Sequence, residues 1–334
     1  MRRLGKILFL IFAAALLISG ALLAYFNSWK SSRISQLQHG SQIAQTIAGK
    51  IEFAQTGTGP FVLVFHGAPG GYDQGLLLGR NLIQNGFQVI APSRPGYLRT
   101  PLETGLTPED QADAMAALLD TLGVGRVAVL GFSLGGPAAI QFAVRHPDRV
   151  QAVVLVSTVI KACYPAPTSP HSISGELTLN SVYSDANSLL LSKESAFFPG
   201  KTIQRMLACE TAMDAQEKDR IASAIAKNPD QLAWFRALVA TTTPEDIRHA
   251  GFTNDVVQLR GLPDVSFDPI QAPLLIIHGV SDADTPISEV KRIMSRLSSA
   301  QFLAVEDSGP IVWLGPNART VNDKILSFLQ ANTH

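Results

Sequence analysis

The chain has 334 residues, of which 46% are hydrophobic, and it carries 27 basic and 27 acidic side chains. This hydrophobic fraction is ample for a large buried core. The balanced charge provides no basic field for nucleic acid, so we expect no nucleic-acid partner. The sequence contains neither a glycine-rich phosphate loop nor a spaced Cys and His cluster, so we predict no nucleotide cofactor and no metal. Cys163 and Cys209 would form one bridge in an exported domain or remain two thiols.

A long apolar segment follows a short basic segment at the N-terminus. Residues 7–26 are interrupted only by Ser19 and Gly20, and about 20 apolar residues suffice for a helix to span a bilayer. We therefore predict a single-pass membrane anchor over residues 1–26. The basic residues before the apolar segment favour a cytoplasmic N-terminus and place the rest of the chain on the non-cytoplasmic side. The alternative is a signal peptide whose cleavage yields a secreted protein.

The segments that follow change in character along the chain. Residues 27–45 are polar and rich in Ser and Gln, and we predict a linker there. Alternating apolar and polar residues over 47–55 predict the opening antiparallel strands. Thr107 followed by Pro108 predicts a helix start, because threonine caps a helix N-terminus and proline suits the first turn. Short β-branched segments that alternate with helices predict a mainly parallel sheet.

The segment around Ser133 carries the strongest chemical pattern. It reads Gly131-Phe132-Ser133-Leu134-Gly135 and joins an apolar strand to an Ala-rich helix. A G-x-S-x-G between a strand and a helix is typical of a nucleophile elbow, which exposes the serine Oγ on a sharp turn. The N–H of Leu134 lies at the start of the helix and has no intrahelical acceptor, so it can stabilise an oxyanion. We predict Ser133 as the nucleophile.

Three other segments extend this pattern. Residues 61–70 form an apolar strand and an HGxPG loop, residues 89–97 form a strand and a Pro/Gly turn, and residues 274–282 form a strand that ends in G-x-x-D. Together with residues 131–135, and in this order, they resemble the α/β-hydrolase superfamily from about residue 45 to the C-terminus. The resemblance implies an α/β-hydrolase fold, with a mainly parallel central sheet that is flanked by helices.

The resemblance also implies site residues and domain limits. The backbone N–H of Ala68 would be the second oxyanion donor. Asp282 would be the catalytic acid, and Asp284 is the nearby alternative. The alternation of strands and helices stops for more than a hundred residues, which is far longer than an ordinary connection and favours a helical cap. The predicted domains are a hydrolase core of residues 46–157 and 271–334 and a helical cap of residues 158–270.

One position departs from the family pattern. Family members usually carry Gly-His after the last strand, and that histidine is the general base, whereas this chain has Gly309-Pro310. Proline cannot accept the serine proton, so the expected triad lacks its third member. His171 and His249 lie in the predicted cap and are candidates for a displaced base.

Two further histidines, His66 and His278, each stand in a His-Gly pair at a strand end, and we interpret both as loop hydrogen-bonding groups. The sequence therefore predicts a serine hydrolase with an atypical or incomplete triad, acting on a small-molecule carboxylic ester or amide. The alternative is a catalytically inactive, membrane-tethered pseudoenzyme that binds a ligand or a partner in the capped pocket. The oligomeric state does not follow from the sequence.

Overall fold

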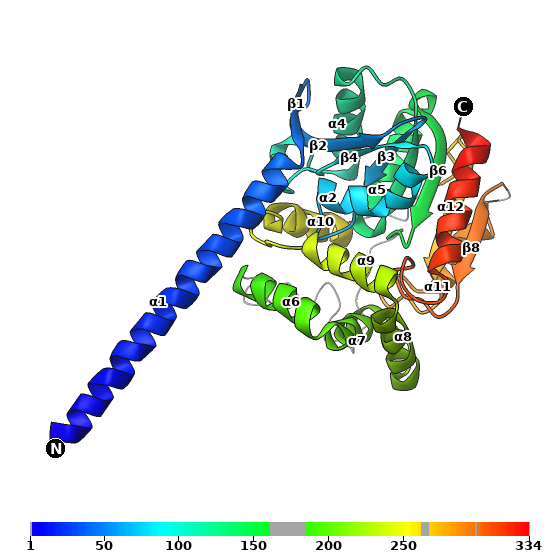
Figure 1. The fold of residues 1–334 in the computed structure, drawn as a ribbon. Helices are drawn as coiled ribbons and strands as arrows, with labels where there is room; N and C mark the ends of the chain where they lie inside the picture. Colours follow the sequence, from blue (N-terminus) through cyan, green and yellow to red (C-terminus); the bar gives the residue numbers. More distant parts are fainter. Residues whose placement is uncertain (1, 161–184, 262–266, 298, 334) are drawn as a thin grey trace.

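The computed structural model describes residues 2–160, 185–261, 267–297 and 299–333. Its sheet has eight strands in the order β1-β2-β4-β3-β5-β6-β7-β8 (Figure 1). The pairs β1–β2 and β2–β4 are antiparallel and all other neighbours are parallel, which confirms the predicted fold class. The strands are β1 (Gln42–Thr46), β2 (Gly49–Gly57), β3 (Phe61–Phe65), β4 (Gln88–Pro92), β5 (Val127–Phe132), β6 (Val150–Val156), β7 (Leu274–Gly279) and β8 (Gln301–Val305).

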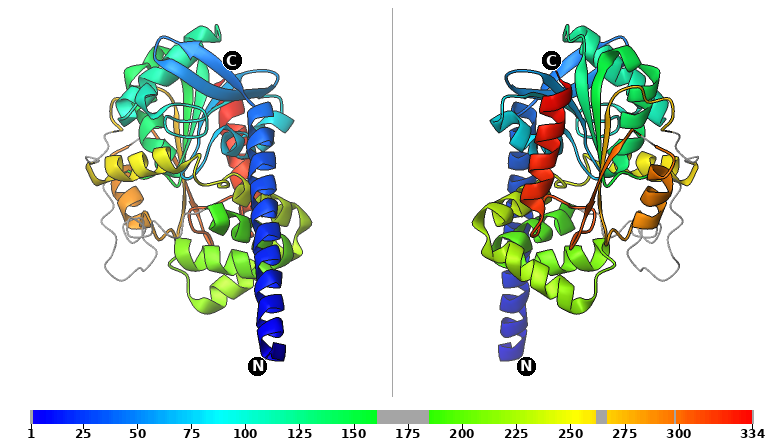
Figure 2. Two further views of the ribbon diagram at one scale, coloured as in Figure 1. Left: turned by 90° about the vertical axis from the view of Figure 1, so that its left-hand side faces the viewer. Right: turned by 90° about the vertical axis from the view of Figure 1, so that its right-hand side faces the viewer.

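Helices cover both faces of the sheet and bury its central strands (Figure 2). All residues of β5 and β7 are buried, as expected for parallel strands between two helix layers. One layer contains α4 (Pro108–Thr121), α5 (Gly136–Arg145) and α11 (Ile287–Met294), and the other contains α2 (Tyr72–Leu78), α3 (Arg80–Gln84) and α12 (Ala318–Asn332). The predicted start of α4 is confirmed, because the Thr107 side chain accepts from the Asp110 N–H and forms a capping box.

Within the described residues, five helices lie between β6 and β7 in the chain and gather at one end of the molecule (Figure 1). We call residues 185–261 the helical insert; they fall within the predicted cap. The insert has a small apolar core of its own, which includes Ile203, Ile225 and Phe235. Its helices are α6 (Asp185–Phe197), α7 (Pro199–Glu210), α8 (Ala215–Lys227), α9 (Pro229–Ala240) and α10 (His249–Gly261). Cys209 lies in α7, and Cys163 lies outside the described residues, so the predicted bridge is not tested.

The chain begins with one helix of 38 residues, α1 (Arg2–His39), which projects from the rest of the molecule (Figure 1). Its first part exposes large apolar side chains, for example Phe9, Leu17 and Leu22, each more than half exposed. By length and composition, α1 is able to cross a membrane. A signal sequence near the N-terminus meets the same criteria of length and composition. Membrane insertion and its direction therefore stay predictions.

The predicted linker over residues 27–45 is wrong, because α1 continues through this polar segment to His39 and β1 follows almost at once. Tertiary contacts stabilise the continued helix. Leu37 is 4% exposed, and its carbonyl accepts a hydrogen bond of 2.7 Å from the Tyr72 hydroxyl. Arg33 donates to the Ala240 carbonyl at 2.9 Å and approaches Asp73 at 3.3 Å. Residues that are polar in sequence therefore dock the helix onto the domain.

This docking predicts resistance of the α1 backbone to trypsin at Lys30 and Arg33 in the folded full-length chain. Leu37→Asp places a charge in a buried site, which costs several kcal/mol, so cleavage at these two residues should become about tenfold faster or more. Ile43→Asp, at a partly exposed position of β1, is the matched control and should leave the rate nearly unchanged. Limited proteolysis followed by mass spectrometry measures the rates. Equally fast cleavage in all three proteins would contradict the docked helix.

Candidate active site

Ser133 occupies a strained turn between β5 and α5. Its backbone φ is 49°, in the left-handed region that a non-glycine residue enters at a cost of about 1 to 3 kcal/mol. The turn packs closely against the end of β3, because a Cβ added at Gly135 would lie 2.3 Å from the His66 carbonyl oxygen. Only glycine fits this contact. The sharp strand-to-helix turn predicted at Ser133 is therefore present.

The HGxPG loop lies beside this turn. A Cβ added at Gly67 would lie 3.2 Å from the Ser133 Cβ. Ala68 packs against a small apolar cluster that contains Leu134, Val159 and Leu259. Ser133, Ala68 and Leu134 are thus brought together as the sequence predicts. The use of the two backbone N–H groups as an oxyanion hole stays a prediction.

Asp282 follows β7, two strands away from β5 at the same edge of the sheet. It is 4% exposed, and its Oδ1 accepts hydrogen bonds of 2.9 Å from the N–H groups of Asp284 and Thr285. Thr211 of the insert pairs with it through an isolated backbone bridge. Burial raises the pKa of Asp282 to about 7, and these backbone hydrogen bonds only partly offset that effect.

His278 is the imidazole next to this acid. Its Nε2 lies 3.4 Å from the Asp282 Oδ2 and donates to the Thr285 carbonyl at 2.8 Å. Burial lowers the pKa of His278 while it raises the pKa of Asp282. Both shifts favour the uncharged forms, so burial disfavours an ion pair between these two groups. The hydrogen bond to Thr285 supports the structural role predicted for His278.

Pro310 is buried in the loop after β8, where the family pattern places the base. The neighbouring Ser308 carbonyl accepts from the Ser281 N–H at 2.9 Å, which ties this loop to the acid loop. A cavity of about 10 Å³, close to the volume one water needs, separates Pro310 from Leu207 and Ile221 of the insert. Apolar side chains of α7 and α8 therefore line the space next to Pro310, the position where the family carries an imidazole.

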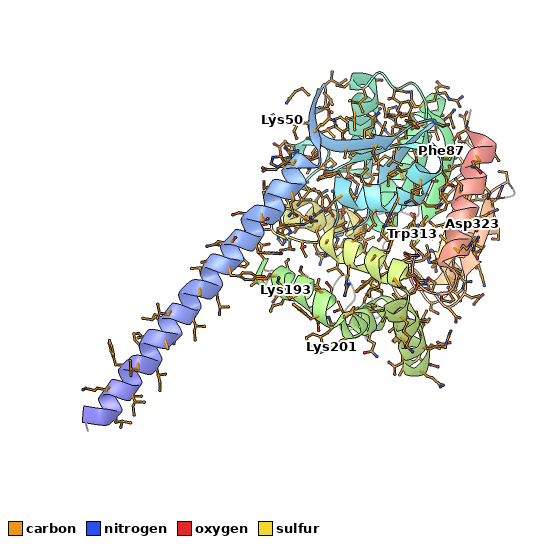
Figure 3. The ribbon with its side chains drawn as sticks, in the orientation of Figure 1. Lys50, Phe87, Lys193, Lys201, Trp313 and Asp323 are labelled. Atoms are coloured by element: carbon orange, nitrogen blue, oxygen red, sulfur yellow. The ribbon has the colours of Figure 1, made fainter. Side chains whose placement is uncertain are left out.

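Trp313 lies three residues further on, in the loop between β8 and α12 (Figure 3). Its ring meets the Phe132 ring edge-on at 5.3 Å and stacks with Trp234 of the insert at 6.0 Å. Its Nε1 is buried and has no hydrogen-bond partner among the described residues. The Trp313 indole, which contacts the ring of Phe132 next to Ser133, therefore carries an N–H donor that no described residue satisfies. An unsatisfied donor in a buried site is costly.

The other histidines do not supply a base to Ser133 within the described residues. His66 Nδ1 donates to the Gly67 carbonyl and its Nε2 accepts from the Arg94 N–H, so both ring nitrogens serve the loop. Burial and the nearby Arg94 hold the pKa of His66 well below its usual range. His249 contacts Glu245 and is half exposed at the start of α10. His171 lies outside the described residues.

A buried ion pair joins the insert to the HGxPG loop. Arg94, which is 1% exposed, pairs with Asp255 of α10 through both guanidinium nitrogens, at 2.8 and 2.5 Å. Its Nε also donates to the His66 carbonyl at 2.9 Å, and the Tyr97 hydroxyl donates to Asp255 at 2.6 Å. In the sequence, Arg94 stands in the Pro/Gly turn of residues 89–97 and Asp255 stands in no recognised motif. No local pattern relates two residues that lie 161 positions apart.

A second buried arginine links the insert, the loop and the N-terminal helix. Arg248 is fully buried and donates to the Gly70 carbonyl and to both carboxylate oxygens of Asp73. Arg33 of α1 shares the same carboxylate at 3.3 Å. Asp73 therefore connects α1 to the loop that carries Ala68, a connection that the sequence does not reveal.

Comparison with known proteins identifies the fold of the chain. A family model described as alpha/beta hydrolase fold matches residues 60–314. The chain belongs to the alpha/beta hydrolase family. An alpha/beta hydrolase fold protein from Nakamurella multipartita superposes with a TM-score of 0.79 at 30% identity, covering 87% of this chain and 99% of that one.

Two curated relatives of this hydrolase also cover most of its length. The uncharacterised hydrolase YcgS of Bacillus subtilis is 28% identical over 289 residues, which are 85% of this chain and 96% of the relative. The pimeloyl-[acyl-carrier protein] methyl ester esterase of Aromatoleum aromaticum is 27% identical over 231 residues, which are 67% of this chain and 80% of the relative. The similarity therefore extends through both halves of the hydrolase core and the insert between them.

The raised pKa of Asp282 predicts a specific pH dependence of stability. Its value of about 7 in the folded chain exceeds the ordinary 3.8, so folding takes up a proton and the free energy of unfolding falls between about pH 4 and pH 7. This difference in pKa lowers the free energy of unfolding by at most about 4 kcal/mol. Asp282→Asn keeps the acceptor for both N–H groups and removes the titration, so its relative stability should be higher at pH 8 than at pH 4. Denaturant unfolding at both pH values measures this, and a difference independent of pH would contradict it.

The Arg94–Asp255 pair predicts a large and local stability effect. Asp255→Asn leaves the buried Arg94 charge without its partner, which typically costs about 3 to 5 kcal/mol. Asp113→Asn is the control, because it breaks an exposed ion pair between Arg145 and Asp113, whose side chains are 42% and 45% exposed. It should lower the free energy of unfolding by about 1 kcal/mol or less. Thermal unfolding of the two variants provides the comparison. Equal losses would show that the buried pair does not hold the insert in place.

Proposed function

We propose that the chain is a serine hydrolase of carboxylic esters, with Ser133 as nucleophile, Asp282 as the acid-position residue and the N–H groups of Ala68 and Leu134 as oxyanion donors. The observation that supports this best is the strained backbone of Ser133, because such strain persists where a function requires it. The Ser133 Oγ makes no hydrogen bond to any other described residue, so it is available to react.

The chemistry would proceed through an acyl-enzyme. The Ser133 Oγ attacks the ester carbonyl, the oxyanion forms opposite the two N–H groups, and the alcohol leaves with the proton that the serine loses. Water then releases the acid and restores the serine. Pro310 cannot carry the proton between these groups. Loss of one triad member leaves roughly 10³ to 10⁴ of rate enhancement over water, so turnover should be slow.

The missing imidazole also bears on the choice of substrate. An amine leaving group must be protonated as it departs, whereas the alcohol of an activated ester departs without that help. We therefore favour esters over amides as substrates. One relative is a methyl ester esterase, which is consistent with this choice.

We also propose that residues 1–26 anchor the protein in a membrane, with the hydrolase core on the non-cytoplasmic side. The helix is long and apolar enough, and the basic residues precede it. Cleavage as a signal peptide, with secretion, is the alternative. A cut near Gly20 would leave Lys30, Arg33 and Leu37 docked on the domain, so the core would keep these contacts in either case.

The second candidate function is a pseudoenzyme that binds a ligand or a partner without cleaving it. It is favoured by Pro310 and by the backbone bridge from Thr211 that covers Asp282. The cavities beside these residues are small in this conformation, at about 10 Å³ next to Pro310 and 20 Å³ next to Leu134. Neither of these two cavities is large enough for a small-molecule ligand without movement of the residues that line it.

Labelling with a fluorophosphonate and hydrolysis of an activated aryl ester separate these functions. The full-length chain is required, since a chain that starts at Ser35 would lack the docked Lys30 and Arg33. We expect slow labelling and slow turnover that both disappear in Ser133→Ala. Pro310→His should raise turnover by up to about 10²-fold if the new imidazole reaches Ser133.

Pro310→Ala is the matched control for loss of the proline ring and should not raise turnover. An unaltered chain that neither reacts nor turns over, together with an active Pro310→His variant, would support the pseudoenzyme. Labelling that persists in Ser133→Ala would contradict Ser133 as the nucleophile.

A further inference from the structure

Helix α6 has its polarity reversed relative to an ordinary surface helix. Its buried residues are the polar Asp185, Ser188 and Ser195. Its exposed side chains include Leu190 and Phe197, which are 66% and 72% exposed. Phe198, which follows the helix, is 65% exposed and extends the apolar surface; an exposed apolar patch of this kind on a soluble domain marks an interaction site.

The exposed residues form one continuous face. Successive residues of this face are four, three and four positions apart, and this spacing places their side chains on the same side of a helix. These residues are Ala186, Leu190, Lys193 and Phe197, and we call them the α6 stripe. The neighbouring α8 shows the usual polarity, because it buries Ile221 and Ile225 and exposes polar residues such as Asp219.

The α6 stripe lies beside α1 at the level where the apolar segment of α1 ends. The Lys193 Nζ stands 5.2 Å from the centroid of the Tyr25 ring, so the Lys193 side chain extends from α6 toward α1. The Lys30 Nζ pairs with Asp185 at 2.5 Å, which fixes the first turn of α6 next to α1. In Figure 1, α6 starts beside α1 and runs away from it rather than along it.

These contacts determine where α6 would stand relative to a bilayer. Residues 7–26 of α1 rise about 30 Å at 1.5 Å per residue, which matches the hydrocarbon core of a membrane. Tyr25 then lies at the interface, where aromatic rings with a polar end are preferred. The α6 stripe, which touches Tyr25 through Lys193, lies at the same depth.

We propose that the α6 stripe and Phe198 rest on the phospholipid bilayer that holds α1. Leu190, Phe197 and Phe198 enter the boundary between headgroups and acyl chains, and Lys193 places its charge among the headgroup phosphates. This proposal rests on the membrane anchor proposed above. It gives the insert a second contact with the membrane and fixes the orientation of the whole domain relative to the lipid surface.

Quenching of tryptophan fluorescence by brominated phosphatidylcholine tests this contact in vesicles that contain the full-length chain. Phe197→Trp and, separately, Leu190→Trp place an indole on the α6 stripe, each in a Trp29→Phe background. Ile47→Trp in the same background is the matched control, because Ile47 is 97% exposed in the turn between β1 and β2. Trp234 and Trp313 are common to all variants, so their emission is subtracted with the Trp29→Phe parent.

We expect brominated lipid to remove most of the emission of the indoles introduced at positions 190 and 197 and to leave that of the Ile47→Trp indole unchanged. The chain that retains Trp29 reports separately whether α1 is inserted. Quenching of Trp29 without quenching of the indoles at positions 190 and 197 overturns the proposal. The same result is expected if a second copy of the chain or a soluble protein, instead of lipid, covers the α6 stripe. Absence of all quenching overturns both the stripe contact and the anchor, whereas Ser133 labelling tests the hydrolase independently.

Discussion

The left-handed backbone at Ser133 is the constraint on which the candidate site depends. It is held by close packing on both sides of the turn. A Cβ at Gly131 would lie 2.7 Å from the Ala139 Cβ, and one at Gly135 would lie 2.3 Å from the His66 carbonyl oxygen. The buried strands β3 and β5 offset the strain, because they fix the turn between elements that cannot move apart without exposing the core.

Buried charges hold the remaining parts of the chain to this turn. Arg94 contacts the His66 carbonyl and Asp255 of the insert, while Arg248 contacts the Gly70 carbonyl and Asp73. Such pairs add little net stability over apolar packing, but breaking one leaves an uncompensated charge. Their effect is therefore to favour one arrangement of the core, the insert and the N-terminal helix over loosely packed alternatives.

The acid position and the base position are consistent with each other. In a complete triad the acid is ionised and orients an imidazole. Here burial raises the pKa of Asp282 to about 7, and backbone N–H groups and the Thr211 bridge occupy its surroundings. Pro310 lines a small cavity together with residues of α7 and α8 in the same region. Asp282 thus faces backbone N–H groups and the imidazole of His278, which itself donates to the Thr285 carbonyl, and the loop after β8 supplies proline at position 310.

The sequence by itself determined the features that local patterns encode. Glycines at the elbow predicted the turn at Ser133, short β-branched strands predicted a mainly parallel sheet, and Thr107 predicted the start of α4, because each signal acts within a few residues. Only the tertiary structure decided that residues 27–39 remain helical. Their helix depends on contacts of Arg33 and Leu37 with residues far along the chain.

The same reason explains the other features that the sequence did not predict. The partners of Arg94 and Arg248 are 161 and 175 positions away in the chain, and no periodicity connects them. No local pattern predicts which face of α6 is buried, since its buried residues are polar and its exposed residues include Leu190 and Phe197. Packing against α1 and the insert decides that face, and packing is a property of the folded chain alone.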